Sequence, residues 1–220
     1  MKPLVLVNFK TYVESSGKNA LKLVQKLSKI KSNFCQIAVA PSLLTAAEVV
    51  KIKLPVFAQH ADALSWGAHT GSILPAELKE LGVQGVVLNH SEKKLSLKVI
   101  KETIQLCQKE KLQTVICCSN LNELKQIVKL HPDYLAYEPQ ELIGKETSVV
   151  AVHPKIITQA VELTRKISSK TKLLCGAGIH SQADFQTALK LGARGILISH
   201  AVVKAKNPEK FLQQLISQSR

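Results

Sequence analysis

The chain alternates between two kinds of segment over its 220 residues. Short apolar, β-branched runs begin near positions 4, 35, 55, 85, 114, 134, 172 and 195, and stretches with helical periodicity lie between them. Strands that alternate with helices form a parallel sheet, and with eight such repeats the sheet closes on itself. The sequence therefore predicts a single-domain (β/α)₈ barrel over residues 1–220, with a closed eight-stranded parallel sheet.

Several of the intervening segments show an apolar face with the helical repeat. The predicted faces are Ala20, Leu23, Val24, Leu27 and Ile30; Leu97, Ile100, Ile104 and Cys107; Ile156, Ala160, Leu163 and Ile167; and Phe211, Leu212, Leu215 and Ile216. Helix starts are marked as well. Asn120 with Glu123 and Ser181 with Asp184 have the spacing of capping boxes, and Asn207 precedes a first-turn proline.

The formal net charge of +14 raises the question of nucleic-acid binding. The positive residues are mostly lysines, because arginine occurs only at 165, 194 and 220, and aromatic residues make up 4% of the chain. Proteins that read nucleic acids depend on arginine forks and stacked aromatic rings. We therefore expect a solvated lysine surface without a specific nucleic-acid partner, whose field attracts small phosphate dianions.

Composition also indicates the surroundings in which the chain works. The first apolar run is short and polar residues interrupt it, so we expect neither a signal peptide nor a membrane span. The cysteines are odd in number and have no Cys-x-x-Cys spacing, so we expect free thiols in a reducing cytoplasm and no zinc or other metal site. They are Cys35, Cys107, Cys117, Cys118 and Cys175.

Three predicted strands end in residues that can carry out chemistry. Glu138 follows the run 134–137 and precedes a proline; Asn8 and Lys10 end the first run, and His90 ends the fourth. Asn8 and Lys10 are two residues apart, so they share a strand face. In a (β/α)₈ barrel the carboxyl ends of the strands carry the active site. A carboxylate, an imidazole and an ammonium are therefore expected to meet there.

His90 is expected to be a neutral imidazole. Ser91 and Glu92 follow it, where a helical turn could begin, and a helix N-terminus disfavours imidazolium. A neutral ring can still donate a hydrogen bond to a carbonyl oxygen. The other histidines are interpreted as structural or surface residues, and the stretch from Trp66 to Gly71 as a loop that could form an interface. These histidines are His60, His69, His131, His153 and His180.

Two further strand ends suggest a phosphate site. Gly176-Ala177-Gly178 follows the seventh run and Ser199 ends the eighth. The loops after these two strands commonly bind phosphate in barrels, through backbone N–H groups and a short helix N-terminus. Glycine also serves in simple turns, so position in the chain supports this interpretation more than the motif does.

Taken together, these motifs resemble the triosephosphate isomerase family, in its short archaeal type, and with it the TIM barrel. The similarity spans nearly the whole chain. It is carried by the segments Asn8-Phe9-Lys10-Thr11-Tyr12, Phe57-Ala58-Gln59-His60, Asn89-His90-Ser91-Glu92, Tyr137-Glu138-Pro139, Glu141-Leu142-Ile143-Gly144, Cys175-Gly176-Ala177-Gly178-Ile179 and Val203-Lys204-Ala205-Lys206-Asn207-Pro208.

The resemblance implies a glycolytic and gluconeogenic isomerase without metal or cofactor, which interconverts dihydroxyacetone phosphate and glyceraldehyde 3-phosphate through an enediolate. It further implies that Glu138 is the base, His90 the neutral electrophile and Lys10 a fixed cation. Asn8 would contact the substrate and Glu92 would support the cluster. Members are dimers or, in the short archaeal form, usually tetramers, so a homo-oligomer is expected.

The same resemblance makes residues 139–149 a closing lid and assigns phosphate contacts to four places. These are Ile143-Gly144, Gly176, Gly178 and Ser199-His200. Two departures stand out: Lys145-Glu146 replaces Thr-Gly in the lid, and His200 replaces a glycine after the eighth strand. The histidine could point outward, contact the phosphate or obstruct it.

Two other functions remain open at this point. One is a basic (β/α)₈ protein that binds a sugar phosphate or RNA without turnover, although binding alone needs no base. The other is a different phosphate-using barrel enzyme, such as an epimerase, which typically has metal ligands or paired acidic residues.

Overall fold

The computed structural model describes residues 2–139 and 154–217, which contain one sheet of eight parallel strands. The strands are paired in the order β2-β1-β8-β7-β6-β5-β4-β3. Their bounds are β1 Leu4–Asn8, β2 Gln36–Ala40, β3 Phe57–Ala58, β4 Gly85–Leu88, β5 Gln113–Cys118, β6 Tyr134–Tyr137, β7 Lys172–Cys175 and β8 Gly195–Ile198. Each begins within two residues of its predicted position.

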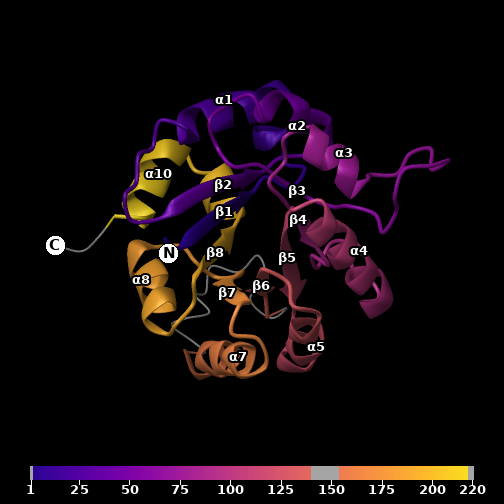
Figure 1. Cartoon of the computed structure of the whole chain (residues 1–220). Helices are drawn as coiled ribbons and strands as arrows, with labels where there is room; N and C mark the ends of the chain where they lie inside the picture. The colour runs from indigo at the N-terminus through magenta and orange to yellow at the C-terminus, as the bar shows by residue number, and fades with distance from the viewer. Residues whose placement is uncertain (1, 140–153, 218–220) are drawn as a thin grey trace.

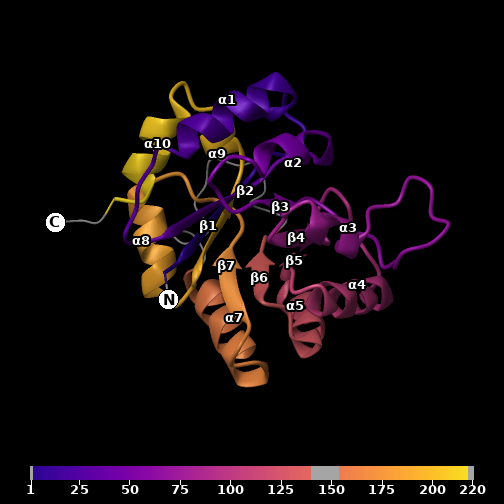
Figure 2. The same cartoon turned by 45° about the horizontal axis from the view of Figure 1, so that its top comes forward.

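The sheet closes into a barrel where its two outer strands meet. An isolated parallel bridge joins Val39 to Val56, and the N–H of Val39 donates to the carbonyl of Pro55 at 3.0 Å. The helices surround the sheet (Figure 1), and a tilted view again places the strands in the middle of the molecule (Figure 2). The predicted (β/α)₈ architecture is confirmed.

The helices follow the strands along the chain. In the described residues they are α1 Lys18–Leu27, α2 Leu43–Val49, α3 Pro75–Glu80, α4 Leu97–Lys109, α5 Leu121–Ile127, α7 Pro154–Ile167, α8 Gln182–Lys190, α9 His200–Val203 and α10 Pro208–Leu215, with the 3₁₀ helices η1 Val13–Ser15 and η2 Val128–Leu130. None of these helices is long and apolar enough to cross a membrane.

One predicted helix face is wrong. The buried side chains of α7 are Ile157, Ala160, Val161 and Thr164, whereas the predicted Ile156, Leu163 and Ile167 are only partly buried. Thr164 can occupy the buried face because its hydroxyl donates to the carbonyl of Ala160 at 2.7 Å, which satisfies the polar group. A pattern based on apolar residues alone passes over it. Leu97, the first residue of α4, is also 42% exposed.

The predicted helix starts are largely present. Ser181 and Asp184 form a reciprocal capping box, and Asn207 accepts from the N–H of Lys210 ahead of α10. Asn120 accepts from the N–H of Glu123 at 2.9 Å, but the Glu123 carboxylate binds the N–H of Ser119 rather than that of Asn120. The second capping box is therefore only half formed.

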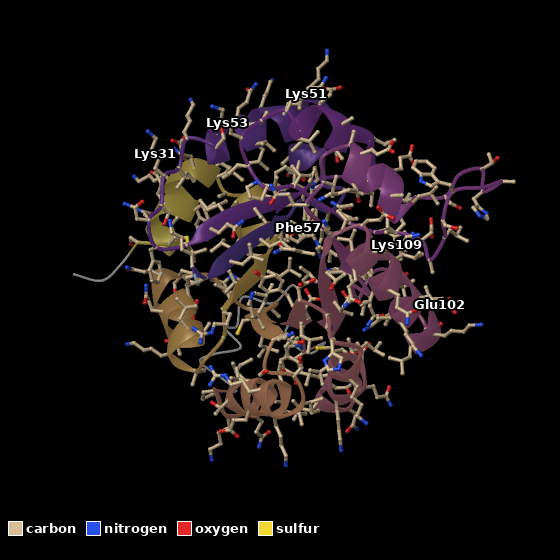
Figure 3. All side chains as sticks on the ribbon, in the orientation of Figure 1. Lys31, Lys51, Lys53, Phe57, Glu102 and Lys109 are labelled. Carbon is tan, nitrogen blue, oxygen red and sulfur yellow. The ribbon has the colours of Figure 1, made fainter. Side chains whose placement is uncertain are left out.

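The core has two layers, which follow the alternation along each strand. Val5 and Val7 of β1 face the helices, while Leu4 and Leu6 face the barrel interior. The interior cluster is Leu4, Leu6, Ala38, Ala40, Phe57, Val87, Val115, Cys117, Tyr134, Ala136, Leu174 and Leu197. Lysines lie outside: Lys31, Lys51 and Lys53 extend from the surface, whereas Phe57 lies among the strands (Figure 3).

This alternation brings polar residues inward just past the strand ends. Asn8 continues the inward series Leu4, Leu6; Glu138 continues Tyr134, Ala136; Gly176 and Ser199 follow inward Leu174 and Leu197. Because all strands are parallel, these positions gather at one end of the barrel.

Candidate active site

A cavity of about 350 Å³ opens at the carboxyl end of the barrel. Most of the predicted site residues line it: Asn8, Lys10, His90, Glu138, Gly176, Gly178, Ser199 and His200. Glu92 lies beside it and contacts Lys10 and His90. The predicted contacts Ile143 and Gly144, the lid segment 140–149 and Glu146 lie outside the described residues. The described residues hold no cluster of three or more metal-ligating side chains.

Glu138 is a buried carboxylate that faces the cavity. It is 5% exposed, and burial raises its pKa from 4.5 to about 7, although the Cys117 thiol and the positive charge of Lys10 act in the opposite direction. Its Oε2 atom has no hydrogen-bond partner in the described part of the chain. A carboxylate of this kind is basic enough to accept a proton near neutral pH.

Gly176 leaves the room that Glu138 needs. A Cβ atom at position 176 would collide with Cγ of Glu138, so a glycine is required next to the carboxylate. The N–H of Gly176 also donates to the carbonyl of Tyr137 at 2.9 Å, which ties β7 to the strand that carries Glu138. The glycine therefore shapes the carboxylate pocket besides lining the cavity.

His90 reaches the cavity because the chain turns sharply before it. Asn89 has φ of 57°, a left-handed conformation that breaks the strand alternation. Nε2 of His90 then lies 3.6 Å from Oε1 of Glu138, and the backbone N–H of Glu92 donates to Nδ1 at 3.2 Å. Since Nδ1 accepts this bond, the neutral ring carries its proton on Nε2, facing the carboxylate.

The predicted reason for a neutral His90 is wrong. No helix begins at Ser91; residues 91–92 form a turn, and α4 starts at Leu97 behind the cap Ser96. Burial and the charge of Lys10 lower the pKa of His90 instead, against the opposite influence of Glu92. Desolvation and a backbone donor thus both favour the neutral ring.

Lys10 is held over the cavity by three neighbours. Its ammonium pairs with Glu92 at 2.7 Å, and its backbone N–H donates to the Asn8 side chain at 3.0 Å. The amide of Gln59 donates to the carbonyls of Lys10 and Ala40 at 3.0 and 2.9 Å. These bonds stabilise the left-handed backbone of Lys10, which has φ of 49°. A fixed cation therefore faces the cavity, and Glu92 contacts both this cation and His90.

The loops after β7 and β8 carry groups suited to an anion. Gly178 has φ of 65°, a conformation that glycine adopts freely. Oγ of Ser199 is buried and has no hydrogen-bond partner among residues 2–139 and 154–217. The short helix α9 starts directly after it, so its first N–H groups precede the helix's own hydrogen bonds. Unpaired donors around a cavity fit a phosphate.

Comparisons with known proteins decide the family. The family model described as triosephosphate isomerase matches residues 3–218. The chain belongs to the triosephosphate isomerase family. It is 41% identical to the triosephosphate isomerase of Methanobrevibacter smithii, covering 98% of each chain. It is 39% identical to that of Methanocaldococcus jannaschii (97% and 98% covered) and 36% to that of Methanothermus fervidus (99% and 99%).

His200, where this chain differs from the family pattern stated above, does not adopt a glycine conformation. It is the exposed first residue of α9, at the cavity rim. Its ring packs edge-on against Tyr12, with centroids 6.4 Å apart, and the ammonium of Lys204 lies 4.7 Å from the Tyr12 ring centre. Of the three orientations considered, this geometry favours the outward one.

Several residues that line this cavity were not predicted from the sequence. Tyr12 and His180 line the cavity, although His180 was interpreted as structural or surface. Its position after the Gly176–Gly178 turn was the available signal. Asn89 was missed as well: its amide donates to the carbonyl of Cys117 at 2.8 Å and to Glu123 at 2.7 Å, which anchors the turn that presents His90.

The loop between β3 and α3 extends away from the barrel (Figures 1 and 2). At its base the backbone N–H of Asp62 donates to the carbonyl of Ile73, and the N–H of Ile73 donates to the Asp62 carboxylate, both at 2.8 Å. Trp66 near its tip is 59% exposed. Val13, in η1 after β1, is 76% exposed, and Leu44, in α2 after β2, is 95% exposed. These apolar side chains are available for contact with another chain.

Proposed function

We propose that this protein interconverts dihydroxyacetone phosphate and glyceraldehyde 3-phosphate, with Glu138 as the base. The carboxylate removes a proton from the carbon next to the substrate carbonyl, and the electron pair forms an enediolate. The protonated carboxyl then returns the proton to the former carbonyl carbon, while the hydroxyl proton passes to the former carbonyl oxygen. Burial supports this role, because a pKa of about 7 lets one group both accept and donate a proton near neutral pH.

His90 and Lys10 stabilise the enediolate in this proposal. The Nε2–H of neutral His90 faces the Glu138 carboxylate and donates to the two substrate oxygens in turn. The ammonium of Lys10, steadied by Glu92, offsets the developing negative charge. Asn8, at the end of β1, contacts the substrate as well. These donors are in position before the reaction, so little reorganisation is needed at the transition state.

The substrate phosphate lies at the loops after β7 and β8. Gly176 and Gly178 shape the turn there, the Ser199 hydroxyl donates to the phosphate, and the first N–H groups of α9 point toward it. His200 stays at the rim against Tyr12. By family similarity, Ile143 and Gly144 add backbone contacts and segment 139–149 covers the substrate.

The observation that carries the proposal is the buried carboxylate with a free oxygen beside a neutral imidazole. Its test is a coupled isomerase assay with glyceraldehyde 3-phosphate on Glu138→Gln and on the control Glu48→Gln, an exposed glutamate of α2. We expect the first substitution to lower kcat by about 10²–10⁴ with KM nearly unchanged, and the control to leave both unchanged. A Glu138→Gln enzyme that keeps more than about a third of the wild-type kcat would contradict the role of base.

We also propose a cytoplasmic homo-oligomer, dimer or tetramer, of a single catalytic domain. The exposed Trp66, Val13 and Leu44 support an interface between copies, and the buried free cysteines suit a reducing compartment. Light scattering on wild type and Trp66→Ser checks the oligomeric state. A wild-type protein that remains monomeric at micromolar concentration would rule it out.

A further inference from the structure

A second cavity, of about 270 Å³, lies at the amino-terminal end of the barrel. Its wall includes Tyr134 and Lys172, the first residues of β6 and β7, and Arg194, which directly precedes β8. Because the strands are parallel, this is the end opposite Glu138. Barrel enzymes place their active sites at the carboxyl end, so the isomerase reaction leaves this cavity without a role.

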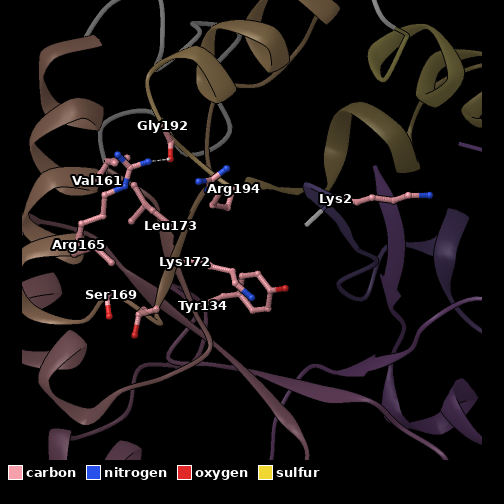
Figure 4. Close-up of a pocket in the computed structure, with 11 residues that line it drawn as sticks. Lys2, Tyr134, Val161, Arg165, Ser169, Lys172, Leu173, Gly192 and Arg194 are labelled. Atoms are coloured by element: carbon pink, nitrogen blue, oxygen red, sulfur yellow. Dashed lines mark hydrogen bonds between the residues drawn. The ribbon is translucent and has the colours of Figure 1, made fainter. Parts of the chain in front are cut away.

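Three cations from three different elements converge on this cavity. Arg165 comes from α7, Lys172 from β7 and Arg194 from the turn before β8 (Figure 4). The lining contains no aspartate or glutamate, and none of the three cations forms an ion pair in the described part of the chain. Like charges held together without a counterion repel one another, and a bound anion relieves that repulsion.

The arginines make the arrangement specific. The chain has only three arginines, at 165, 194 and 220, and two of them line this one cavity. A guanidinium presents a planar fork of donors that matches phosphate oxygens, whereas a lysine acts as a point charge. In a chain whose surface is otherwise lysine, this pairing of arginines differs from the general positive field.

The side chains are also partly prepared for a ligand. Nη2 of Arg165 donates to the carbonyl of Gly192 at 3.2 Å, which fixes its direction, and the Lys172 ammonium lies 5.0 Å from the Tyr134 ring centre. The Arg194 guanidinium makes no hydrogen bond within residues 2–139 and 154–217. Arg165 and Arg194 flank Gly192 and Leu173, while Lys2 extends away from the group (Figure 4).

An acidic residue lies next to this wall in the sequence but outside the cavity. Asp133 precedes Tyr134 in the sequence, but its Oδ2 accepts from the backbone N–H of Thr114 at 2.8 Å and from the Thr114 hydroxyl at 3.1 Å. Asp133 does not line this cavity. Arg165, Lys172 and Arg194 therefore have no carboxylate partner in the described residues and can pair with a ligand.

We propose that Arg165, Lys172 and Arg194 form a second anion site, which binds a small molecule with two or more phosphate charges. A cavity of about 270 Å³ favours a compact ligand over a nucleic-acid strand, which needs an extended groove. Inorganic pyrophosphate is the simplest probe of this chemistry. The site is separate from the substrate cavity, so its occupant is not the triose phosphate under reaction.

Titration calorimetry with sodium pyrophosphate tests the site. To separate it from the substrate cavity, the background is Lys10→Met, which removes the cation there; any binding that remains at Gly178 and Ser199 would not respond to the arginine substitutions below. We expect the Lys10→Met protein to bind one pyrophosphate per chain. Adding Arg165→Gln and Arg194→Gln should weaken that binding by at least about tenfold, the worth of one charge-assisted hydrogen bond. Adding Lys26→Gln and Lys29→Gln, exposed lysines in and just after α1, removes the same charge and should leave the affinity unchanged.

Arg194→Gln alone provides a second variant if the double replacement does not fold, and it too should weaken binding. Three results would overturn the proposal. Lys10→Met could bind no pyrophosphate at millimolar concentration, which would place any wild-type binding in the substrate cavity. The arginine and lysine variants could lose pyrophosphate affinity equally, which would show that the overall positive charge of the protein, and not this site, binds the anion. The arginine substitutions could weaken the binding of duplex RNA but not that of pyrophosphate, which would show that the site binds a different class of ligand.

Discussion

The buried Glu138 carboxyl should make the protein less stable at high pH than at low pH. Burial raises its pKa from 4.5 to about 7, so the folded state holds this proton more tightly than the unfolded chain. Its contribution to stability is therefore fully present below pH 4.5 and is lost as pH rises through about 7. The complete shift corresponds to roughly 3 kcal/mol.

Glu138→Gln removes this titration, so we expect it to increase the free energy of unfolding relative to wild type, mainly at high pH. The gain should be about 2–3 kcal/mol larger at pH 8 than at pH 5. Glutamine also adds N–H donors that face the cavity, but that effect is the same at both pH values. The pH-dependent difference is therefore the quantity to measure.

Urea unfolding of wild type, Glu138→Gln and Glu48→Gln at the two pH values provides the measurement. The exposed Glu48 controls for removing a carboxylate from the surface, and its substitution should change stability by less than about 0.5 kcal/mol. A Glu138→Gln effect of equal size at pH 5 and pH 8 would refute the reasoning, because it would show that the carboxyl titrates alike in both states.

The other predictions concern the cavity walls and the surface. ¹⁵N NMR should show one protonated nitrogen, Nε2, on His90 at pH 6; an imidazolium pattern there would contradict the electrophile role. Gly176→Ala should lower kcat by about 10² by displacing Glu138, with folding checked by circular dichroism, and near-normal kcat would show that the carboxylate tolerates the methyl group. His200→Gly should leave KM nearly unchanged between pH 6 and 8 while lowering stability by about 0.4–1 kcal/mol; a wild-type KM that rises with pH and a variant that lacks the rise would show phosphate contact instead. Turnover at low substrate should fall with salt, and duplex DNA should bind more weakly than a Kd of about 10⁻⁷ M.

Much of the barrel and of the site could be read from the sequence because the signals are local. A strand of four or five residues has one alternation and one end, so Asn8 and Glu138 follow directly from counting along β1 and β6. Parallel pairing then brings these ends together without further information. The same logic located Gly176 and Ser199.

What could not be read depends on contacts between distant residues or on backbone dihedral angles. The left-handed Lys10 is not a glycine, so nothing in its identity announces the turn, and Asn89 gives only a weak signal because asparagine is enriched in this conformation. Gln59 holds Lys10 across 49 positions of sequence. His180 reaches the cavity through a turn whose direction the residue types do not specify. The buried face of α7 was predicted wrongly because the hydroxyl of Thr164 forms a hydrogen bond within the helix and can therefore be buried.

The donor that selects the His90 tautomer is a main-chain group, the N–H of Glu92. Ordinary substitution at position 92 changes the side chain that pairs with Lys10 but leaves this donor in place. Only proline lacks it. The path of the backbone therefore determines which ring nitrogen carries the proton, and most substitutions at position 92 leave it unchanged. Descendants of this chain can exchange the charge partner of Lys10 while keeping the same nitrogen turned toward the substrate.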